Sequence, residues 1–211
     1  MSNLHKMFAL LEEKYPTAGC ELNHNSPFEL LVAVILSAQC TDRRVNEVTK
    51  TLFTRANTPQ QFADMDIAEL EGLIFTCGFY RNKAKNIKAA SKAICEKFGG
   101  KVPSTMDELR LLDGVGRKTA NVVLSVAFGQ PTIAVDTHVF RVSHRLGFSN
   151  AATPDEVEKD LMQLIPDDLK PTAHHLLIFH GRYCCKAIKP NCVECPIRDY
   201  CVEKDKIKQN I

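Results

Sequence analysis

The amino-acid sequence predicts an all-α protein, and three observations support that class. Apolar residues recur at spacings of three and four along nearly the whole chain of 211 residues, as on one face of a helix. Capping signals and glycines divide these stretches into short segments. The one β-branched run, residues 132–135, has no second run with which to pair. We therefore expect about ten short helices.

The first clear helix lies at residues 28–38, which are apolar on nearly every side. Such a segment is expected at the centre of a core, and it ends in the polar turn 37–42. Three amphipathic stripes follow, with the apolar members Val45, Val48, Leu52 and Phe53, then Ile67, Leu70, Leu73 and Ile74, then Ala84, Ile87, Ile94 and Phe98. Further helices are expected to start at Thr105 and Thr153, each with glutamate three residues later, and stops are expected at Gly99, Gly129 and Gly147.

The composition is that of an ordinary globular protein, with 45% apolar and 25% charged residues. A chain of this length can bury a substantial core without disulfides. The longest strongly apolar run, residues 30–36, is too short to cross a bilayer. The N-terminus lacks the basic-then-apolar form of a secretory signal. We expect a soluble protein of the cell interior.

Charge is segregated along the chain although the net charge is only +2. Residues 81–101 contain seven basic side chains and one acid, whereas residues 150–168 contain six acids and one base. Segregation of this kind can give a nearly neutral protein one basic face that binds a polyanion. Ordinary solvated helix surfaces are the alternative explanation.

Nine cysteines are many for this length, and the number is odd. Five of them crowd into residues 184–201, and the other four are Cys20, Cys40, Cys77 and Cys95. An odd, clustered set without a signal peptide argues against a secreted disulfide framework. It favours a metal site in a reducing compartment.

Four of the clustered cysteines have the spacing Cys185-x6-Cys192-x2-Cys195-x5-Cys201. Sites of four thiolates hold either zinc or an iron–sulfur cluster. Zinc ribbons usually present two Cys-x2-Cys pairs, whereas this segment has one, and its wider intervals suit a bulkier [4Fe–4S] cluster. Zinc and unligated thiols are the alternatives. Cys184 is expected to point elsewhere, because it directly precedes an expected ligand.

The loop between the first two of these cysteines carries Lys186 and Lys189. A basic loop that metal ligands hold at both ends can contact phosphates. A plain surface loop would look the same in sequence.

A second motif, residues 111–121, is typical of a helix, a tight turn and another helix. Gly114 and Gly116 permit positive φ and a close approach of a ligand to the backbone. The N–H groups at the start of the second helix favour an anion such as phosphate. The segment lacks the P-loop pattern, and a simple turn is the alternative.

Two ionisable residues near this motif could perform chemistry. Lys118 lies in the first turn of the second helix, where a cation is unfavourable, and Arg117 adds like charge. Both effects favour a neutral, nucleophilic amine, although a solvent-facing lysine is the simpler interpretation. Asp136 lies between an apolar run and a helix start, where it suits the N-cap position. A carboxylate there could also steer proton transfer and stabilise positive charge on a sugar.

The hairpin with Lys118, the downstream Asp136 and the x6-x2-x5 cysteine loop together resemble the endonuclease III family, from residue 28 to Cys201. These are DNA glycosylase/AP lyases of the helix-hairpin-helix superfamily. The resemblance implies a two-lobed helix-hairpin-helix DNA glycosylase fold. A six-helix barrel would cover residues 21–131, and residues 1–20 and 132–211 would carry a structural [4Fe–4S] cluster.

The resemblance also implies roles for individual residues. Lys118 would attack C1′ of a damaged nucleoside after the base leaves the stack, and the resulting Schiff base would permit β-elimination of the strand. Asp136 would activate the lysine and stabilise the sugar cation. Gln39 would fill the vacated space, and Phe79 would act as a wedge between bases. The further DNA contacts expected are Gly114, Val115, Gly116, His138, Lys186 and Lys189.

The resemblance implies double-stranded DNA with an oxidised pyrimidine or an abasic site as the substrate. We expect a monomer without membrane contact, in the cytoplasm with the nucleoid. Two departures from the family pattern are Asp113, where the hairpin usually has proline, and the aromatic Phe79, where many relatives are aliphatic. Asp113 would weaken the phosphate contact, and Phe79 would change the opposite-base preference.

Other functions fit part of this pattern. Monofunctional adenine-mismatch glycosylases share the fold, the aspartate and the cluster but lack the nucleophilic lysine. A thymine- or uracil-mismatch glycosylase would differ only in pocket residues. A non-catalytic DNA-binding module or a ferredoxin-like electron carrier belongs to another class, and neither needs both Lys118 and Asp136.

Overall fold

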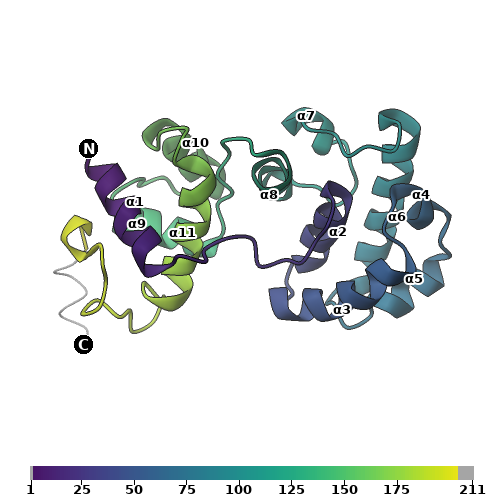
Figure 1. Ribbon diagram of the computed structural model, residues 1–211, viewed down its shortest axis with the longest axis horizontal. Helices are drawn as coiled ribbons and strands as arrows, with labels where there is room; N and C mark the ends of the chain where they lie inside the picture. Colours follow the sequence, from purple (N-terminus) through teal and green to yellow (C-terminus); the bar gives the residue numbers. More distant parts are fainter. Residues whose placement is uncertain (1, 204–211) are drawn as a thin grey trace. The chain divides into compact units, whose positions relative to one another are not determined.

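A computed structural model of the protein describes residues 2–203, and all regular secondary structure in that range is helical (Figure 1). The all-α prediction is therefore confirmed. None of the helices in this range is long and apolar enough to span a membrane. The elements are α1 (Asn3–Lys14), α2 (Pro27–Ser37), α3 (Asp42–Arg55), α4 (Pro59–Asp64), α5 (Ile67–Ile74), α6 (Tyr80–Phe98), α7 (Met106–Leu109), α8 (Arg117–Phe128), α9 (Thr137–Arg145), α10 (Pro154–Leu164), α11 (Lys170–Tyr183) and the 3-10 helix η1 (Arg198–Tyr200).

The chain divides into two compact units, each with its own apolar core. The hairpin unit comprises Cys20–Gly129 and contains α2 to α8. The cysteine unit comprises, of the described residues, 2–19 and 130–203. The cysteine unit therefore combines the N-terminal helix with the C-terminal third of the chain.

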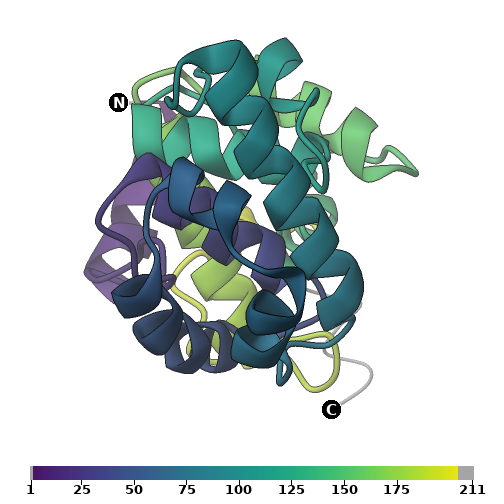
Figure 2. The same ribbon diagram turned by 90° about the vertical axis from the view of Figure 1, so that its right-hand side faces the viewer.

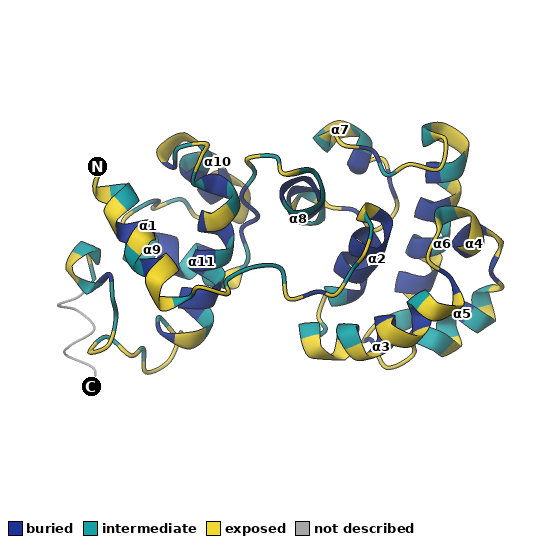
Figure 3. Ribbon diagram, in the orientation of Figure 1, coloured by how far each residue is buried: buried dark blue, intermediate teal, exposed yellow. Residues whose placement is uncertain are grey.

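The centre of the hairpin unit is α2, whose residues 28–36 are all buried (Figure 3). The helix starts with Pro27 after Ser26, whose hydroxyl accepts a hydrogen bond from the Glu29 N–H. It packs against α3, α6 and α8. The expected central helix is confirmed, and it is apolar on all sides because other helices surround it.

The 19-residue α6 forms one side of the hairpin unit, and the shorter α4 and α5 pack against it (Figure 2). Its apolar face buries Ala84, Ile87 and Ile94, as the third stripe predicts. The helix ends at Gly99, which is in the left-handed conformation. Phe98, the last member of the predicted stripe, is half-buried.

The cysteine unit packs α1 and α9 against α11, and α10 against α9. Met7, Phe8 and Leu11 from α1 are buried in its core. Thr153 forms the expected capping box at the start of α10, with Glu156 as its partner. This core supports the segment that leads from α11 into the cysteine loop.

The β-branched run does not form a strand. Residues 132–135 are an extended segment that leads into α9. The side chains of Ile133, Ala134 and Val135 are buried. Because the described residues offer no second strand for pairing, the run forms no β-sheet, and its apolar side chains are buried in a helical core instead. Its course ends at Asp136, directly before α9.

Candidate active site and metal centre

The glycine hairpin lies between α7 and α8, as the sequence predicts. Gly114 has φ +77°, and a Cβ added there would lie 2.9 Å from the Asn86 Cβ of α6. Glycine is therefore required for both its conformation and its small size. The Val115 side chain is buried and its N–H donates to the Leu112 carbonyl at 3.1 Å. Val115 thus anchors the turn rather than presenting a side chain to a ligand.

Helix α8 begins at Arg117 with Gly116 as its N-cap, and this glycine offers no side-chain cap. A helix start of this kind favours an anion. Lys118 is exposed in the first turn, so its amine is accessible to a ligand. Asp113 is exposed in the turn before Gly114, where its negative charge opposes an anion.

Asp136 is the N-cap of α9, in agreement with its position in the sequence. Its Oδ1 accepts hydrogen bonds from the His138 and Val139 N–H groups, both at 2.8 Å. The His138 Nδ1 donates to Oδ2 at 3.0 Å. These contacts hold the half-buried carboxylate in one orientation. Asp136 belongs to the cysteine unit, whereas Lys118 belongs to the hairpin unit.

Gln39 and Phe79 lie in two turns that are neighbours within the hairpin unit. Gln39 follows α2, and Phe79 directly precedes α6. A Cβ added at Gly78 would lie 3.6 Å from the Gln39 carbonyl oxygen, which shows how closely the turns approach. The Gln39 side chain is exposed, and Phe79 is 66% exposed. Phe79 is therefore not a core aromatic.

An unusual backbone conformation links three of the expected DNA contacts. Among the described residues, the non-glycine positions with positive φ are Gln39 at 53°, Phe79 at 58° and Lys189 at 49°. The left-handed conformation costs about 1–2 kcal/mol for a residue with a side chain. Such strain is concentrated at functional sites, where the surrounding structure maintains it.

The five C-terminal cysteines line one pocket in the cysteine unit. The ends of α9 and α11 contribute Arg145 and His180 to its wall. The pocket brings together the four spaced cysteines, which are Cys185, Cys192, Cys195 and Cys201. Four cysteines that line one pocket are the donor set of an iron–sulfur cluster.

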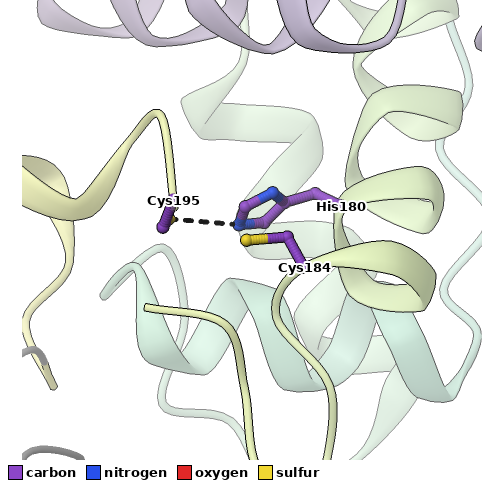
Figure 4. A group of neighbouring side chains, drawn as sticks. All are labelled: His180, Cys184 and Cys195. Carbon is purple, nitrogen blue, oxygen red and sulfur yellow. Dashed lines mark hydrogen bonds between the residues drawn. The ribbon is translucent and has the colours of Figure 1, made fainter. Parts of the chain in front are cut away.

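The expectation that Cys184 points away from the site is wrong. Its sulfur, the Cys195 sulfur and a His180 ring nitrogen all lie within 4.8 Å of one another (Figure 4). The Cys184 thiol also donates to the Asn191 carbonyl at 3.3 Å. The reason is that α11 ends here with the N–H groups of both Cys184 and Cys185 bonded to the His180 carbonyl. This tight turn directs two successive cysteines to one pocket.

Polar neighbours favour a thiolate, the form that binds metal, at two of the four spaced cysteines, Cys185 and Cys195. The neighbouring Cys184 thiol lowers the pKa of Cys195 to about 4, against the effect of burial, and His180, whose Nε2 lies 3.7 Å from the Cys195 sulfur, adds to this shift. Burial raises the pKa of Cys185, but hydrogen bonds from His180 and Arg145 outweigh it, so the net shift is downward. Burial raises the pKa of Cys192 and Cys201.

Two arginines of α9 hold the start of the cysteine loop. Arg141 Nε donates to the Cys185 carbonyl at 3.0 Å, and its Nη2 donates to the Gly181 carbonyl at 2.8 Å. Arg145 Nη1 donates to the Lys186 carbonyl at 2.8 Å and to the Cys185 sulfur at 3.3 Å. Sequence analysis missed this role, although two arginines four residues apart must share one face of the helix.

The loop that these arginines hold exposes Lys186 and Lys189. His138, the remaining expected DNA contact, is half-buried beside Asp136. A Cβ added at Gly181 would lie 2.8 Å from the His138 Cβ, so α9 and α11 approach closely at this point. Asp136, which caps α9, and the cysteine loop, which follows α11, are therefore both held by the packing of α9 against α11.

Two family models match the chain. The first describes the HhH-GPD superfamily of base excision DNA repair proteins and matches residues 32–167. The second describes the iron–sulfur binding domain of endonuclease III and matches residues 185–201. The second match begins at the first of the four spaced cysteines and ends at the last.

The chain is also similar to individual proteins over nearly its whole length. Endonuclease III of Bacillus subtilis (strain 168) is 55% identical over 195 residues, which are 92% of this chain and 89% of the relative. A solved endonuclease III–DNA trapped covalent intermediate is 50% identical, with a TM-score of 0.89 and 98% of each chain covered. A non-covalent endonuclease III–DNA complex is 49% identical, with a TM-score of 0.90 and 99% of each chain covered.

The helical fold, the glycine hairpin and the cysteine pocket define an HhH-GPD enzyme of base-excision DNA repair, a DNA glycosylase and AP lyase. Within that class, the chain belongs to the endonuclease III family. The predicted enzyme class and the [4Fe–4S] cofactor are therefore confirmed. The matched iron–sulfur binding domain favours the cluster over zinc at the four spaced cysteines, and the family is that of an enzyme, unlike a non-catalytic module or an electron carrier.

Proposed function

We propose that this enzyme removes oxidised pyrimidines from duplex DNA and cleaves abasic sites, with Lys118 as the nucleophile. The observation that carries the proposal is the exposed amine in the first turn of α8, directly after the glycine hairpin. A relative that is 50% identical has been trapped as a covalent intermediate with DNA, which is the chemistry that a nucleophilic amine provides.

The reaction begins when the Lys118 amine attacks C1′ and the damaged base leaves with the N-glycosidic electron pair. Loss of a proton and opening of the sugar ring give a protonated Schiff base between Lys118 and C1′. The Schiff base acidifies the C2′ protons, and removal of one expels the 3′ phosphate by β-elimination. Hydrolysis then releases the sugar fragment and restores the amine.

In this proposal Asp136 assists both the nucleophile and the sugar. Its carboxylate would accept a proton from the Lys118 amine and stabilise the positive charge that develops at C1′. Hydrogen bonds from two backbone N–H groups and from His138 orient it for this task. The same contacts make it the cap of α9, so catalytic and structural roles coincide in one side chain.

The DNA contacts divide into two groups. Phosphates would bind the backbone at Gly114, Val115 and Gly116 and the exposed lysines of the cysteine loop, while His138 would contact DNA beside Asp136. The side chains of Gln39 and Phe79 would enter the space that the flipped nucleotide leaves. The exposure of Gln39 and Phe79 and their neighbouring turns support this second group.

The four ligands of the cluster would be Cys185, Cys192, Cys195 and Cys201. They share the pocket and the spacing of the family's iron–sulfur domain. The cluster would fix the loop that carries Lys186 and Lys189 and take no part in the reaction. Cys184 and His180 would form the wall behind it.

The remaining features follow from the family and the composition. We propose that residues 21–131 are the barrel lobe and that residues 1–20 and 132–211 are the cluster lobe. The enzyme would act as a monomer on duplex DNA in the cytoplasm, with the nucleoid. An odd, clustered set of nine cysteines suits a reducing compartment of this kind.

Borohydride trapping on duplex DNA with one thymine glycol tests the proposal. Wild type should form a trapped adduct and a nicked strand, and Lys118→Ala should form neither. Lys50→Ala, which removes an exposed lysine of the hairpin unit outside the basic run 81–101, is the matched control and should behave as wild type. Base release without trapping in wild type would overturn the role of Lys118 and indicate a monofunctional glycosylase.

A further inference from the structure

Two thiols that the proposed reaction does not use lie beside the turns of Gln39 and Phe79. Cys40 directly follows Gln39 and is half-buried, whereas Cys77 precedes Gly78 and is fully buried. The Cys40 N–H donates to the Ser37 carbonyl at 3.0 Å, and the Cys77 N–H donates to the Ile74 carbonyl at 2.9 Å. Each cysteine is therefore fixed in a tight turn at the end of a helix.

The two cysteines are neighbours, although 37 positions separate them in the chain. Cys77 belongs to the apolar core cluster of the hairpin unit, and the Cys40 side chain packs against the same cluster. Burial, followed by the neighbouring Cys40, raises the pKa of Cys77 to about 11. The backbones of the two turns are also close, since a Cβ added at Gly78 would lie 3.6 Å from the Gln39 carbonyl oxygen.

A buried cation completes this group. Lys83 is 5% exposed, and its Nζ donates to the Leu36 carbonyl at 2.8 Å near the end of α2. Burial lowers the pKa of Lys83, and the neighbouring Cys77 and Cys40 act against that shift. A buried ammonium is costly without a nearby negative charge, and Lys83 acts to lower the pKa of Cys77 against the larger effect of burial.

We propose that Cys40 and Cys77 are a site of reversible oxidation, at which a hydroperoxide converts the two thiols to a disulfide. Cys40 reacts first because it is the more accessible sulfur. It attacks one peroxide oxygen, the O–O bond breaks, and a sulfenic acid and water form from hydrogen peroxide. The Cys77 sulfur then attacks the Cys40 sulfur, and the hydroxyl group leaves with the Cys77 proton as a second water.

The disulfide would join the two turns covalently. An S–S bond of about 2.05 Å draws the sulfurs closer than any contact between two thiols allows. Gln39 and Phe79 lie next to the joined segments, so their positions would shift. The effect on repair rests on the proposed roles of these two residues, whereas formation of the disulfide does not.

Peptide mapping of the peroxide-treated holoenzyme tests the site. Free thiols are alkylated after treatment, and the visible absorbance of the iron–sulfur cluster is followed to select conditions in which it persists. Wild type should yield a linked peptide pair joining Cys40 and Cys77, with a mass lower by two hydrogen atoms, which dithiothreitol restores. Cys40→Ser and Cys77→Ala should lose the linked pair. Cys20→Ser, at another half-buried cysteine of the hairpin unit, should retain it.

Separate alkylation of Cys40 and Cys77 in wild type after peroxide treatment, with the cluster intact, would overturn the proposal. Excision of thymine glycol by the same samples gives a second measurement. The oxidised wild type should be slower by about tenfold or more, with recovery in dithiothreitol, because small displacements of positioning groups cost large factors in rate. A linked pair with unchanged excision would support the oxidation site and contradict the roles of Gln39 and Phe79.

Discussion

Arg145 donates a hydrogen bond of 2.8 Å from its Nη1 to the Lys186 carbonyl oxygen, so a side chain of α9 fixes the loop that carries Lys186 and Lys189. The same guanidinium also contacts the Cys185 sulfur at 3.3 Å. One arginine therefore connects the helix that Asp136 caps to the first of the four spaced cysteines. This link is the basis of the first prediction.

Replacement of Arg145 by alanine should destabilise the cysteine loop and the cluster. Hydrogen bonds from a charged group contribute about 1.5–3 kcal/mol, and the loop would lose several of them. We expect a lower melting temperature and faster loss of the cluster absorbance on exposure to a chelator. Arg43→Ala is the matched control, because that side chain is 90% exposed on α3. Equal cluster loss in both variants would contradict the assigned role.

Replacement of Gly114 by alanine should impair both stability and DNA binding. The left-handed backbone and the 2.9 Å approach to Asn86 together should cost about 1–3 kcal/mol. Gly72→Ala is the control, because a Cβ there meets nothing within 4 Å and α5 should become more stable by about 0.5–1 kcal/mol. Chemical denaturation and DNA titration measure both effects. A stable Gly114→Ala variant with full DNA affinity would show that the turn tolerates a side chain.

Two substitutions at Asp136 should separate its catalytic role from its structural role. An asparagine at this position would carry no charge but could still cap α9 through its amide oxygen, so Asp136→Asn should keep nearly the stability of wild type. Asp136→Ala should lose about 1 kcal/mol. Both variants should lose about 100-fold or more in excision rate, because both lack the carboxylate. Full activity in Asp136→Asn would leave Asp136 with the capping role alone.

Replacement of Phe79 by glycine should raise stability and lower activity. Glycine adopts the φ of 58° without the cost of about 1 kcal/mol that a side chain carries there. Loss of the exposed ring should slow excision, since no group would remain to enter the base stack. Phe75→Gly is the control: that exposed phenylalanine has a right-handed backbone, so glycine should lower its stability. Thermal unfolding and single-turnover excision distinguish the two variants.

Much of the local structure could be predicted from the sequence, because it depends on neighbours along the chain. The Thr153 cap with Glu156, the glycine that ends α8 and the buried α2 all follow from residues within a few positions of one another. The predicted position of Asp136 as a cap was correct for the same reason. The cysteine spacing likewise predicts an iron–sulfur site, since the four spaced cysteines occupy one short segment, and the family's iron–sulfur binding domain matches that segment.

Other features depend on packing between distant segments, and a sequence pattern does not encode them. The orientation of Cys184 was mispredicted because the turn at the end of α11 places adjacent cysteines in one pocket. The role of Arg145 requires α9 to lie beside the cysteine loop.

By itself, then, the sequence determined the helical class, many of the helix ends and the hairpin, and it predicts the reactive side chains. Those properties arise from spacing, capping and chemistry within single segments. Only the tertiary structure decided that Gln39 meets Gly78, and that Cys40 and Cys77 are neighbours. Such contacts join segments far apart in the chain, and the packing of whole helices around the α2 core sets their distances.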